Sequence, residues 1–374
     1  MTQQIDAIAL AQDLVRFKTV NPPGDEAACA HHLGDLLAQH GFSVTYHPLA
    51  EAREGLVARL GGRGGGRALA FTGHLDTVPL GAADWQRDPF AATIEDGRLH
   101  GRGSTDMKAG VAAFCAAAIS CRDAISAGPG IELVITAAEE TGSQGAQEIA
   151  RKPDGLGEAG ALIVAEPTSN LPACGHKGAL WMKAICQGVT AHGSMPERGV
   201  NAAYKAGRLL SNLAAFDHGV EPHPVMGPAT LNVGTVSAGL NLNSVPDRAE
   251  IGIDIRSIAG MAHAAIHENV TSVLGADCDA IEVLVDLPSV WTDPEDTWIA
   301  RSAETVARLT GTPPTPRAAS YFTDASVLTP AYGHVPTLIL GPGAAHLAHQ
   351  TNEYCELEQI RTAVEIYRRL ILEW

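Results

Sequence analysis

The stretch RALAFTGHLDTVP, residues 67–79, joins a mostly apolar run to a histidine and a carboxylate. The apolar part is typical of a strand that is buried on both faces. His74 and Asp76 follow at once, where a loop would need only Gly or Pro. Whether they form a metal site depends on whether other strands end in the same kind of side chain.

Other apolar runs predict further strands, at residues 131–138, 161–166 and 335–343. Segments with helical character alternate with them, at residues 5–17, 26–41, 106–120 and 357–374. Apolar strands that alternate with helices indicate an α/β fold with a mostly parallel sheet covered on both faces. The Gly-rich residues 61–66 predict a flexible loop and match no nucleotide-binding motif.

The pattern changes in the middle of the chain. From residue 178 to 288 the order is strand, helix, two strands, helix and strand, at residues 179–188, 201–216, 229–239, 248–256, 259–275 and 280–286. This βαββαβ order is the split βαβ, ferredoxin-like arrangement of a small α+β domain. We therefore predict a discontinuous catalytic domain, residues 1–176 and 289–374, with an inserted domain at residues 177–288.

Length and charge narrow the class of protein. A chain of 374 residues is long enough for two domains. Its net charge of −16 argues against nucleic-acid or anionic-membrane partners, which need clustered Lys and Arg. Seven scattered cysteines without a C-x-x-C spacing indicate reduced thiols. With neither a signal peptide nor a membrane span, we expect a soluble, cytoplasmic protein.

Metal-type side chains recur where the predicted strands and the Ala-rich helix meet loops: His74, Asp106, Glu139, Glu140, Glu166 and His349. The carboxyl ends of parallel strands meet at one edge of a sheet, so these side chains should converge there. Two histidines and several carboxylates, without cysteine, suit Zn²⁺ or another first-row divalent ion. The carboxylates would repel one another unless two ions, about 3.5–4 Å apart, lay between them. Asp76 is placed to orient the His74 ring.

Six motifs resemble those of one family, in family order and over nearly the whole chain: GHLDTVP, GRGSTDMKAG, AAEETGSQGA, AEPT, TAHGSMPERGVNAA and GPGAAHLAHQTNEY. It is the di-zinc metallopeptidase family that contains acetylornithine deacetylase, succinyl-diaminopimelate desuccinylase, aminoacylase and glutamate carboxypeptidase. The resemblance implies that His74 and Glu166 hold one zinc, Glu140 and His349 the other, with Asp106 bridging and Glu139 as general base. It also implies a cis peptide between Asp106 and Met107. His346 is a competing ligand, but the AHQTNEY context favours His349.

The resemblance also gives the inserted domain a role as lid and dimerisation domain. It implies a homodimer in which His192 reaches the partner's site and stabilises the oxyanion. Asn243 and Arg256 match positions that grip the substrate carboxylate, a task that suits the Arg fork. Taken alone, His192 and Arg256 could be ordinary solvated surface residues. Gly341 and Gly343 would let backbone N–H groups approach the substrate, although a tight turn would explain them equally well.

These features predict a di-metal hydrolase that cleaves the amide bond of a small N-acyl amino acid or a similar carboxylate-bearing substrate. Zinc is the expected metal, and cobalt or manganese would also suit the ligands. By resemblance, Glu at position 166 accompanies deacylases and carboxypeptidases, which favours an acetylornithine deacetylase-like or succinyl-diaminopimelate desuccinylase-like deacylase. A metallo-carboxypeptidase or dipeptidase acting on short peptides is the alternative. A non-catalytic metal protein would lack a base or a ligand, and neither is missing. A serine hydrolase is not supported because no G-x-S-x-G occurs.

Overall fold

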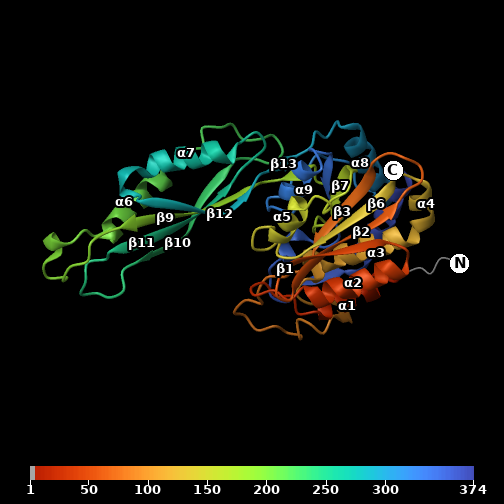
Figure 1. Ribbon diagram of the computed structural model, residues 1–374, viewed down its shortest axis with the longest axis horizontal. Helices are drawn as coiled ribbons and strands as arrows, with labels where there is room; N and C mark the ends of the chain where they lie inside the picture. The colour runs from red at the N-terminus through yellow and green to blue at the C-terminus, as the bar shows by residue number, and fades with distance from the viewer. Residues whose placement is uncertain (1–4) are drawn as a thin grey trace. The chain divides into compact units, whose positions relative to one another are not determined.

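The computed structural model describes residues 5–374, which form two compact units (Figure 1). The first unit contains the described residues up to Gly175 together with Trp291–Ala319 and Thr323–Trp374. The second, which we call the inserted unit, contains His176–Val290 and Ser320–Phe322. The predicted α/β class with an inserted α+β domain is confirmed.

A six-stranded sheet forms the centre of the first unit. Its strands, in spatial order, are β1 (Ser43–Ala50), β2 (Arg53–Gly61), β6 (Gly130–Thr136), β3 (Ala68–His74), β7 (Ala159–Val164) and β14 (Thr337–Ile339). The last four are parallel, as predicted, whereas β1 and β2 add an antiparallel hairpin at one edge. That hairpin was not predicted, because much of β1 is solvent-exposed and it carries no continuous apolar run.

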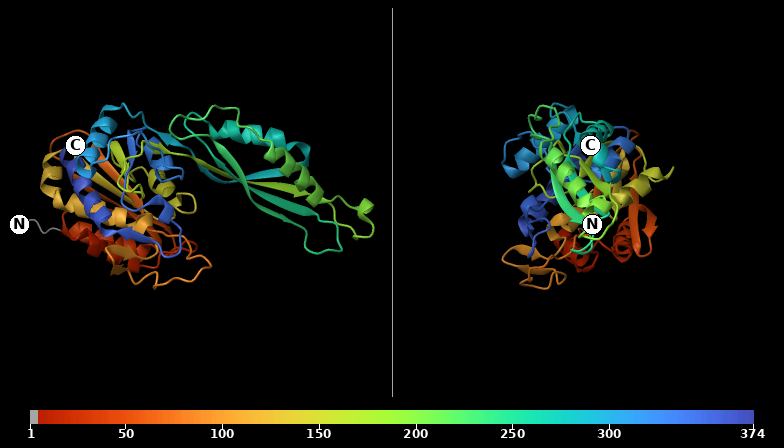
Figure 2. Two further views of the ribbon diagram at one scale, coloured as in Figure 1. Left: turned by 180° about the vertical axis from the view of Figure 1, so that it is seen from behind. Right: turned by 90° about the vertical axis from the view of Figure 1, so that its left-hand side faces the viewer.

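Helices cover both faces of this sheet (Figures 1 and 2). One core joins the sheet to α1 (Ala7–Arg16), α2 (Ala27–Gln39), α3 (Ala109–Ser120), α4 (Arg122–Ala127), α8 (Thr297–Thr310) and α10 (Leu357–Leu372). On the opposite face, Thr136 of β6 donates to Asp324, which lies just before α9 (Ala325–Ala331). There α9 packs against α5 (Gln144–Arg151). Both sheet faces are therefore buried, which explains why the parallel strands are apolar throughout.

The inserted unit has the order β9 (Ala179–Gln187), α6 (Ala202–Ala214), β10 (Thr230–Ala238), β11 (Arg248–Arg256), α7 (His263–Leu274) and β12 (Ala280–Leu287). Its strands form an antiparallel sheet in the order β10-β11-β9-β12. Alternate residues of β9 and β11 pack against α6 and α7, which cover one face. This is the predicted βαββαβ arrangement, and the other face of the sheet stays open to solvent.

Register brings the strand ends of the first unit together. His74 at the end of β3 pairs with Thr136, and Val164 at the end of β7 pairs with Ile339. A small sheet of β4 (Thr93–Glu95), β5 (Arg98–His100) and β15 (Tyr354–Glu356) joins the chain after His349 to the segment before Asp106. Short elements complete the structure: β8 (Gly175–His176), β13 (Val290–Trp291), and the single turns at Ser104–Lys108, Pro196–Arg198, Gly275–Asp277 and Ala345–Leu347.

Close packing holds the start of α3 against the end of β7. A Cβ atom on Gly110 would lie 2.1 Å from the carbonyl oxygen of Ala165, so only glycine fits there. This contact places the turn that carries Asp106 beside Glu166. Among residues 5–374, no helix has both the length and the apolar character that crossing a membrane requires.

Candidate active site

Asp106 lies between two imidazoles. Its Oδ1 atom is 3.2 Å from Nε2 of His74, and its Oδ2 atom is 3.3 Å from Nε2 of His349. The side chain projects from an irregular turn, Ser104–Lys108, so the regular helix starts at Ala109 and not at residue 106 as predicted. The Asp106–Met107 peptide is cis, as the resemblance implies. Asp106 thus presents one oxygen to each histidine.

Two further carboxylates complete the arrangement, one beside each histidine. Glu166 Oε1 is 3.6 Å from His74 Nε2, and Glu140 Oε2 is 3.1 Å from His349 Nε2. One potential ligand atom from each of His74, Asp106 and Glu140 lies within 4.8 Å of the other two, and the same holds for His74, Glu139 and Glu166. The structure therefore brings all five predicted metal ligands together.

Asp76 has a different set of contacts from the one predicted. The Nδ1 atom of His74 is 2.9 Å from the backbone carbonyl of Asp76 and 3.5 Å from its carboxylate. The buried carboxylate instead accepts from the backbone N–H groups of Glu139 and Glu140, at 3.0 and 3.2 Å, and from Asn21 Nδ2 at 2.8 Å. Asp76 therefore supports His74 mainly through its backbone, and it also fixes the turn that aims the two glutamates.

The cluster holds more carboxylates than its two imidazoles can neutralise. Burial, together with neighbouring Asp106, raises the pKa of Glu140 to about 7 and raises the pKa of Glu166 well above its usual range. Hydrogen bonds with Asp106 and Glu140 raise the pKa of His349 to about 10. Burial disfavours the charged forms of Asp106 and His74, but hydrogen bonds lower the pKa of Asp106 and raise that of His74. Protons thus compensate for negative charge in this pocket.

Divalent cations fit this pocket. Within residues 5–374, the buried Oε1 atoms of Glu139 and Glu140 have no hydrogen-bond partner. A buried acceptor without a donor costs roughly 1–3 kcal/mol, and more when the group is charged. Two histidines with oxygen ligands suit zinc and neighbouring metals, and ligand protons leave when such ions bind. The donor set therefore matches two divalent ions.

Glu139 precedes Glu140 on the same turn, and one of its oxygens lies within 4.8 Å of potential ligand atoms of His74 and Glu166. It is 4% exposed, and Asp76 accepts its backbone N–H. Burial raises the pKa of Glu139 well above its usual range, and neighbouring Glu166 adds to the effect. Ala138 before it has φ of +58°, in the left-handed region that side chains rarely adopt. A nearby cation would favour the ionised form of Glu139, which a general base requires.

The remaining predicted side chains lie in the inserted unit. His192 is exposed, pairs with Ser244 as an isolated bridge, and has Nδ1 2.7 Å from Ser194 Oγ. Asn243 is exposed next to this bridge, and its carbonyl accepts from Gly193 N. Arg256 lies at the other end of the sheet.

Arg256 is half-buried in an aromatic setting that was not predicted. Its Nε is 2.9 Å from Asp254 Oδ1, and its guanidinium carbon is 5.9 Å and 5.8 Å from the ring centroids of Trp181 and Phe322. Trp181 Nε1 also donates to Asp254. The Nε and Nη2 atoms of Arg256 both donate to Asp254, so two of its nitrogens are engaged within the protein, and binding of a substrate carboxylate stays a prediction.

The prediction for the two glycines differs from the structure. The N–H of Gly341 already donates to Thr168 Oγ1, and the N–H of Gly343 to Gln359 Oε1. A Cβ atom on Gly341 would lie 2.2 Å from the carbonyl oxygen of Ala165. Close approach between loops therefore explains these glycines, and their N–H groups do not point at a substrate. His346 lies in the turn Ala345–Leu347, and it is His349 that contacts Asp106 and Glu140.

Three buried polar residues around the site were missed. Asn21 bonds to Asp76, while Arg102 and Glu353 form an ion pair beside the Asp106 turn. Arg102 and Glu353 lie within the GRGSTDMKAG and AHQTNEY motifs. Their positions in the sequence, close to the predicted ligands Asp106 and His349, could have indicated a role at the site. Nothing in the local pattern marks Asn21, whose partners are far away in the chain.

The fold and this ligand set define a metal-dependent hydrolase. The chain matches the profile of the family described as peptidase family M20/M25/M40 over residues 70–373, and it belongs to that family.

Relatives cover nearly the whole length of the chain. A succinyl-diaminopimelate desuccinylase from Ruegeria sp. is 31% identical, covering 99% of this chain and 95% of its own. A probable succinyl-diaminopimelate desuccinylase from Staphylococcus epidermidis is 28% identical, covering 97% and 96%. An M20 family metallo-carboxypeptidase from Sulfolobus solfataricus shares the fold, with a TM-score of 0.83 at 17% identity, covering 98% of this chain and 99% of its own.

Proposed function

We propose that this protein is a di-zinc deacylase that hydrolyses the amide bond of a small N-acyl amino acid, of the N-acetyl or N-succinyl kind. One observation carries the proposal: the two oxygens of Asp106 face His74 and His349 separately, with Glu139 beside them on the turn held by Asp76. The desuccinylases that the chain resembles support an acylated amino acid as substrate.

Each residue of the site has a separate role in the proposed amide hydrolysis. His74 and Glu166 would hold one ion, Glu140 and His349 the other, and Asp106 both. Bound ions of this kind polarise a carbonyl and lower the pKa of water. Glu139 takes the proton from the water that attacks the amide carbon and then delivers it to the leaving amine. Arg256 would bind the carboxylate of the substrate.

Geometry within the inserted unit supports a homodimer. Gln187 pairs with Arg248 at the start of β11, and His192 and Asn243 lie beyond this end, whereas Arg256 ends the strand. Residues at the two ends of this strand are about 27 Å apart, given roughly 3.4 Å per residue. One small substrate cannot touch both ends within a single chain. In the proposed dimer, the second copy supplies His192 and Asn243 to the site.

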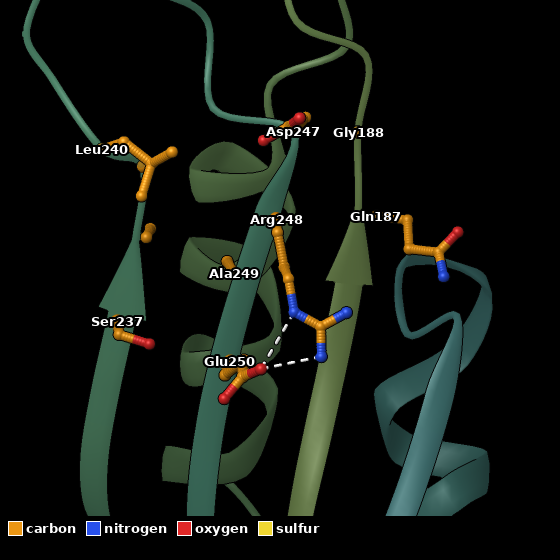
Figure 3. A pocket seen from close by; sticks show the side chains of 10 residues that line it. Gln187, Gly188, Ser237, Leu240, Asp247, Arg248, Ala249 and Glu250 are labelled. Atoms are coloured by element: carbon orange, nitrogen blue, oxygen red, sulfur yellow. Dashed lines mark hydrogen bonds and ion pairs between the residues drawn. The ribbon is translucent and has the colours of Figure 1, made fainter.

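The free edge of the same sheet is suited to pairing with a second copy. No strand within residues 5–374 pairs with the outer side of the edge strand β10, and the loop after it carries Leu240 and Leu242, which are 98% and 106% exposed. Figure 3 shows the surface hollow at this end of the sheet, where Leu240 lies near the Arg248–Glu250 pair. Exposed strand edges and fully exposed leucines are liabilities unless another surface covers them.

A complementation experiment tests whether sites are shared. Variants Glu139→Ala and His192→Ala should each be nearly inactive, since each removes a different part of one site. After mixing under conditions that exchange subunits, about a quarter of wild-type activity should return, because half of the dimers are mixed and each holds one intact site. Activity equal to the mean of the two parents would show that each chain supplies its own His192.

The substrate is tested by measuring metal content and hydrolysis together. The purified protein should contain two ions per chain, with zinc as the expected native metal, and should cleave N-acetyl or N-succinyl amino acids in preference to dipeptides. Acyl chains of increasing length, on amino acids with and without a free carboxylate, would define the pocket. If only dipeptides were cleaved, the protein would be a dipeptidase and not a deacylase. If the purified protein contained no metal, the proposed metal site would be wrong.

We place the enzyme in the cytoplasm as part of the same proposal. All seven cysteines are free thiols, and six of them are buried. Free thiols of this kind are usual in a reducing compartment.

A further inference from the structure

A buried ion pair connects the loops that carry the metal ligands. Arg102 is 1% exposed and Glu353 is not exposed at all, and Nη1 of Arg102 lies 2.6 Å from Oε2 of Glu353. Neither residue belongs to the predicted ligand set. The pair is therefore a charged element of the core that the proposed reaction leaves unexplained.

The Glu353 carboxylate holds the turn that carries Asp106. Besides Arg102, it accepts from three backbone N–H groups at the start of that turn: Gly103 N at 3.1 Å, just before it, Thr105 N at 2.8 Å and Asp106 N at 3.1 Å. Its two oxygens thus receive two donors each. The backbone of Asp106 itself is fixed by this carboxylate.

The same residue is close in the chain to His349. Two hydrogen bonds to backbone carbonyls join its segment to the turn and to the residues before it: Gly101 N donates to Glu353 O at 3.0 Å, and the Thr105 side-chain Oγ1 donates to Tyr354 O at 2.6 Å. Strand β15, which begins at Tyr354, pairs with β5 just before the turn. Glu353 therefore fixes Asp106 relative to the loop of His349.

Arg102 extends the connection to the loop that follows His74. Its Nη2 atom donates to the carbonyl of Pro79 at 3.1 Å, and its guanidinium lies 5.2 Å from the ring centroid of Trp85. One buried pair thus ties together the loops that follow His74, contain Asp106 and follow His349. The spacing of His74, Asp106 and His349 determines whether Asp106 can lie between the two histidines.

Stability alone does not account for such a pair. Removing two charges from water is expensive, and well-packed apolar side chains of similar volume are often equally stable or more so. Four donors to one buried carboxylate, by contrast, define the position of the backbone around it. We propose that Arg102 and Glu353 are positioning residues that hold Asp106 between His74 and His349, so that two metal ions bind tightly. The inference rests on the di-metal site of the proposed function.

Metal binding by Glu353→Gln tests the proposal. The amide keeps the size of the side chain, but its NH₂ group faces two of the four donors, so the turn should shift. Apoprotein prepared with a chelator is titrated with cobalt, and the absorption bands of the bound cobalt are recorded. We expect roughly 10–100-fold weaker binding and shifted bands, which is the usual effect of losing a partner that supports metal ligands.

A matched control lies on the same strand pair. Glu356 of β15 pairs with Arg98 of β5 at 2.9 Å, but both side chains are exposed. Glu356→Gln should bind cobalt as the wild type does. Thermal unfolding of the apoproteins is measured in parallel, because a purely structural role would lower the melting temperature and leave cobalt affinity and spectrum unchanged.

A second variant decides the matter if Glu353→Gln does not fold. Arg102→Lys keeps the charge but loses the fork that reaches both Glu353 and Pro79. Weaker cobalt binding by this variant supports the proposal. Wild-type affinity and spectrum in either folded variant would overturn it. Since these measurements use metal binding alone, a wild type that binds two ions but cleaves no N-acyl amino acid would contradict the proposed function and not this inference.

Discussion

Replacing Glu139 with alanine is expected to lower kcat by roughly 10²–10⁴-fold, the range that general acid–base groups contribute. Two metal ions per chain should remain bound, because His74, Asp106, Glu140, Glu166 and His349 stay in place. Metal analysis of the variant, together with its kcat and KM on the best N-acyl amino acid, checks both parts. The metal content matters, because potential ligand atoms of Glu139, Glu166 and His74 all lie within 4.8 Å of one another.

A control variant and the metal content of Glu139→Ala decide how a loss of activity is interpreted. Glu148 of α5 is a partly exposed carboxylate paired with Lys152, so Glu148→Ala should leave kcat unchanged. If Glu139→Ala instead lost one ion, Glu139 would be a ligand and the base would have to be sought elsewhere. Undiminished hydrolysis with two ions bound would show that Glu139 moves no proton.

Removing the metal should abolish hydrolysis. Glu139 would then act on water and on an amide carbonyl that no cation polarises, and bound divalent ions supply several kcal/mol of transition-state stabilisation. That corresponds to a loss of about 10³-fold or more. Dialysis against a chelator, followed by addition of zinc, cobalt or manganese, should remove and then restore the activity.

Asp106→Asn should prevent that recovery. An amide presents only one oxygen, so it cannot face both His74 and His349, and the variant should bind fewer than two ions. Glu132 serves as the control, because it is also buried but bonds to Arg59 and to the backbone N–H of Gly157. Glu132→Gln should keep two ions, whereas two tightly bound ions in Asp106→Asn would rule out a bridging role.

The chemistry of the site was readable from local patterns. Apolar runs that end in His74, Glu139, Glu140 and Glu166 predicted both the parallel strands and the edge where the ligands meet, and the structure brings these side chains together. The alternation in residues 248–256 and its neighbours predicted the inserted α+β unit. Both conclusions depend on periodicity and on residue type, which are properties of short segments.

Contacts between distant segments were not readable in this way. The carboxylate of Asp76 accepts from the backbone of the 139–140 turn at 3.0 and 3.2 Å and lies 3.5 Å from His74 Nδ1. The N–H groups of Gly341 and Gly343 turned out to be engaged within the protein. Local spacing carries no information on which donor reaches a given carboxylate.

Glu353 shows most clearly why such contacts cannot be predicted from local patterns. It accepts a hydrogen bond from Asp106, which is 247 residues away in the sequence, and its four donors come together only because β5 and β15 pair. Periodicity along the chain predicts which residues are buried. The role of a buried charge, by contrast, depends on the hydrogen-bond partners that folding places around it. Ligand identity is therefore a property of the chain, while the spacing that makes those ligands a two-ion site arises from long-range hydrogen bonds.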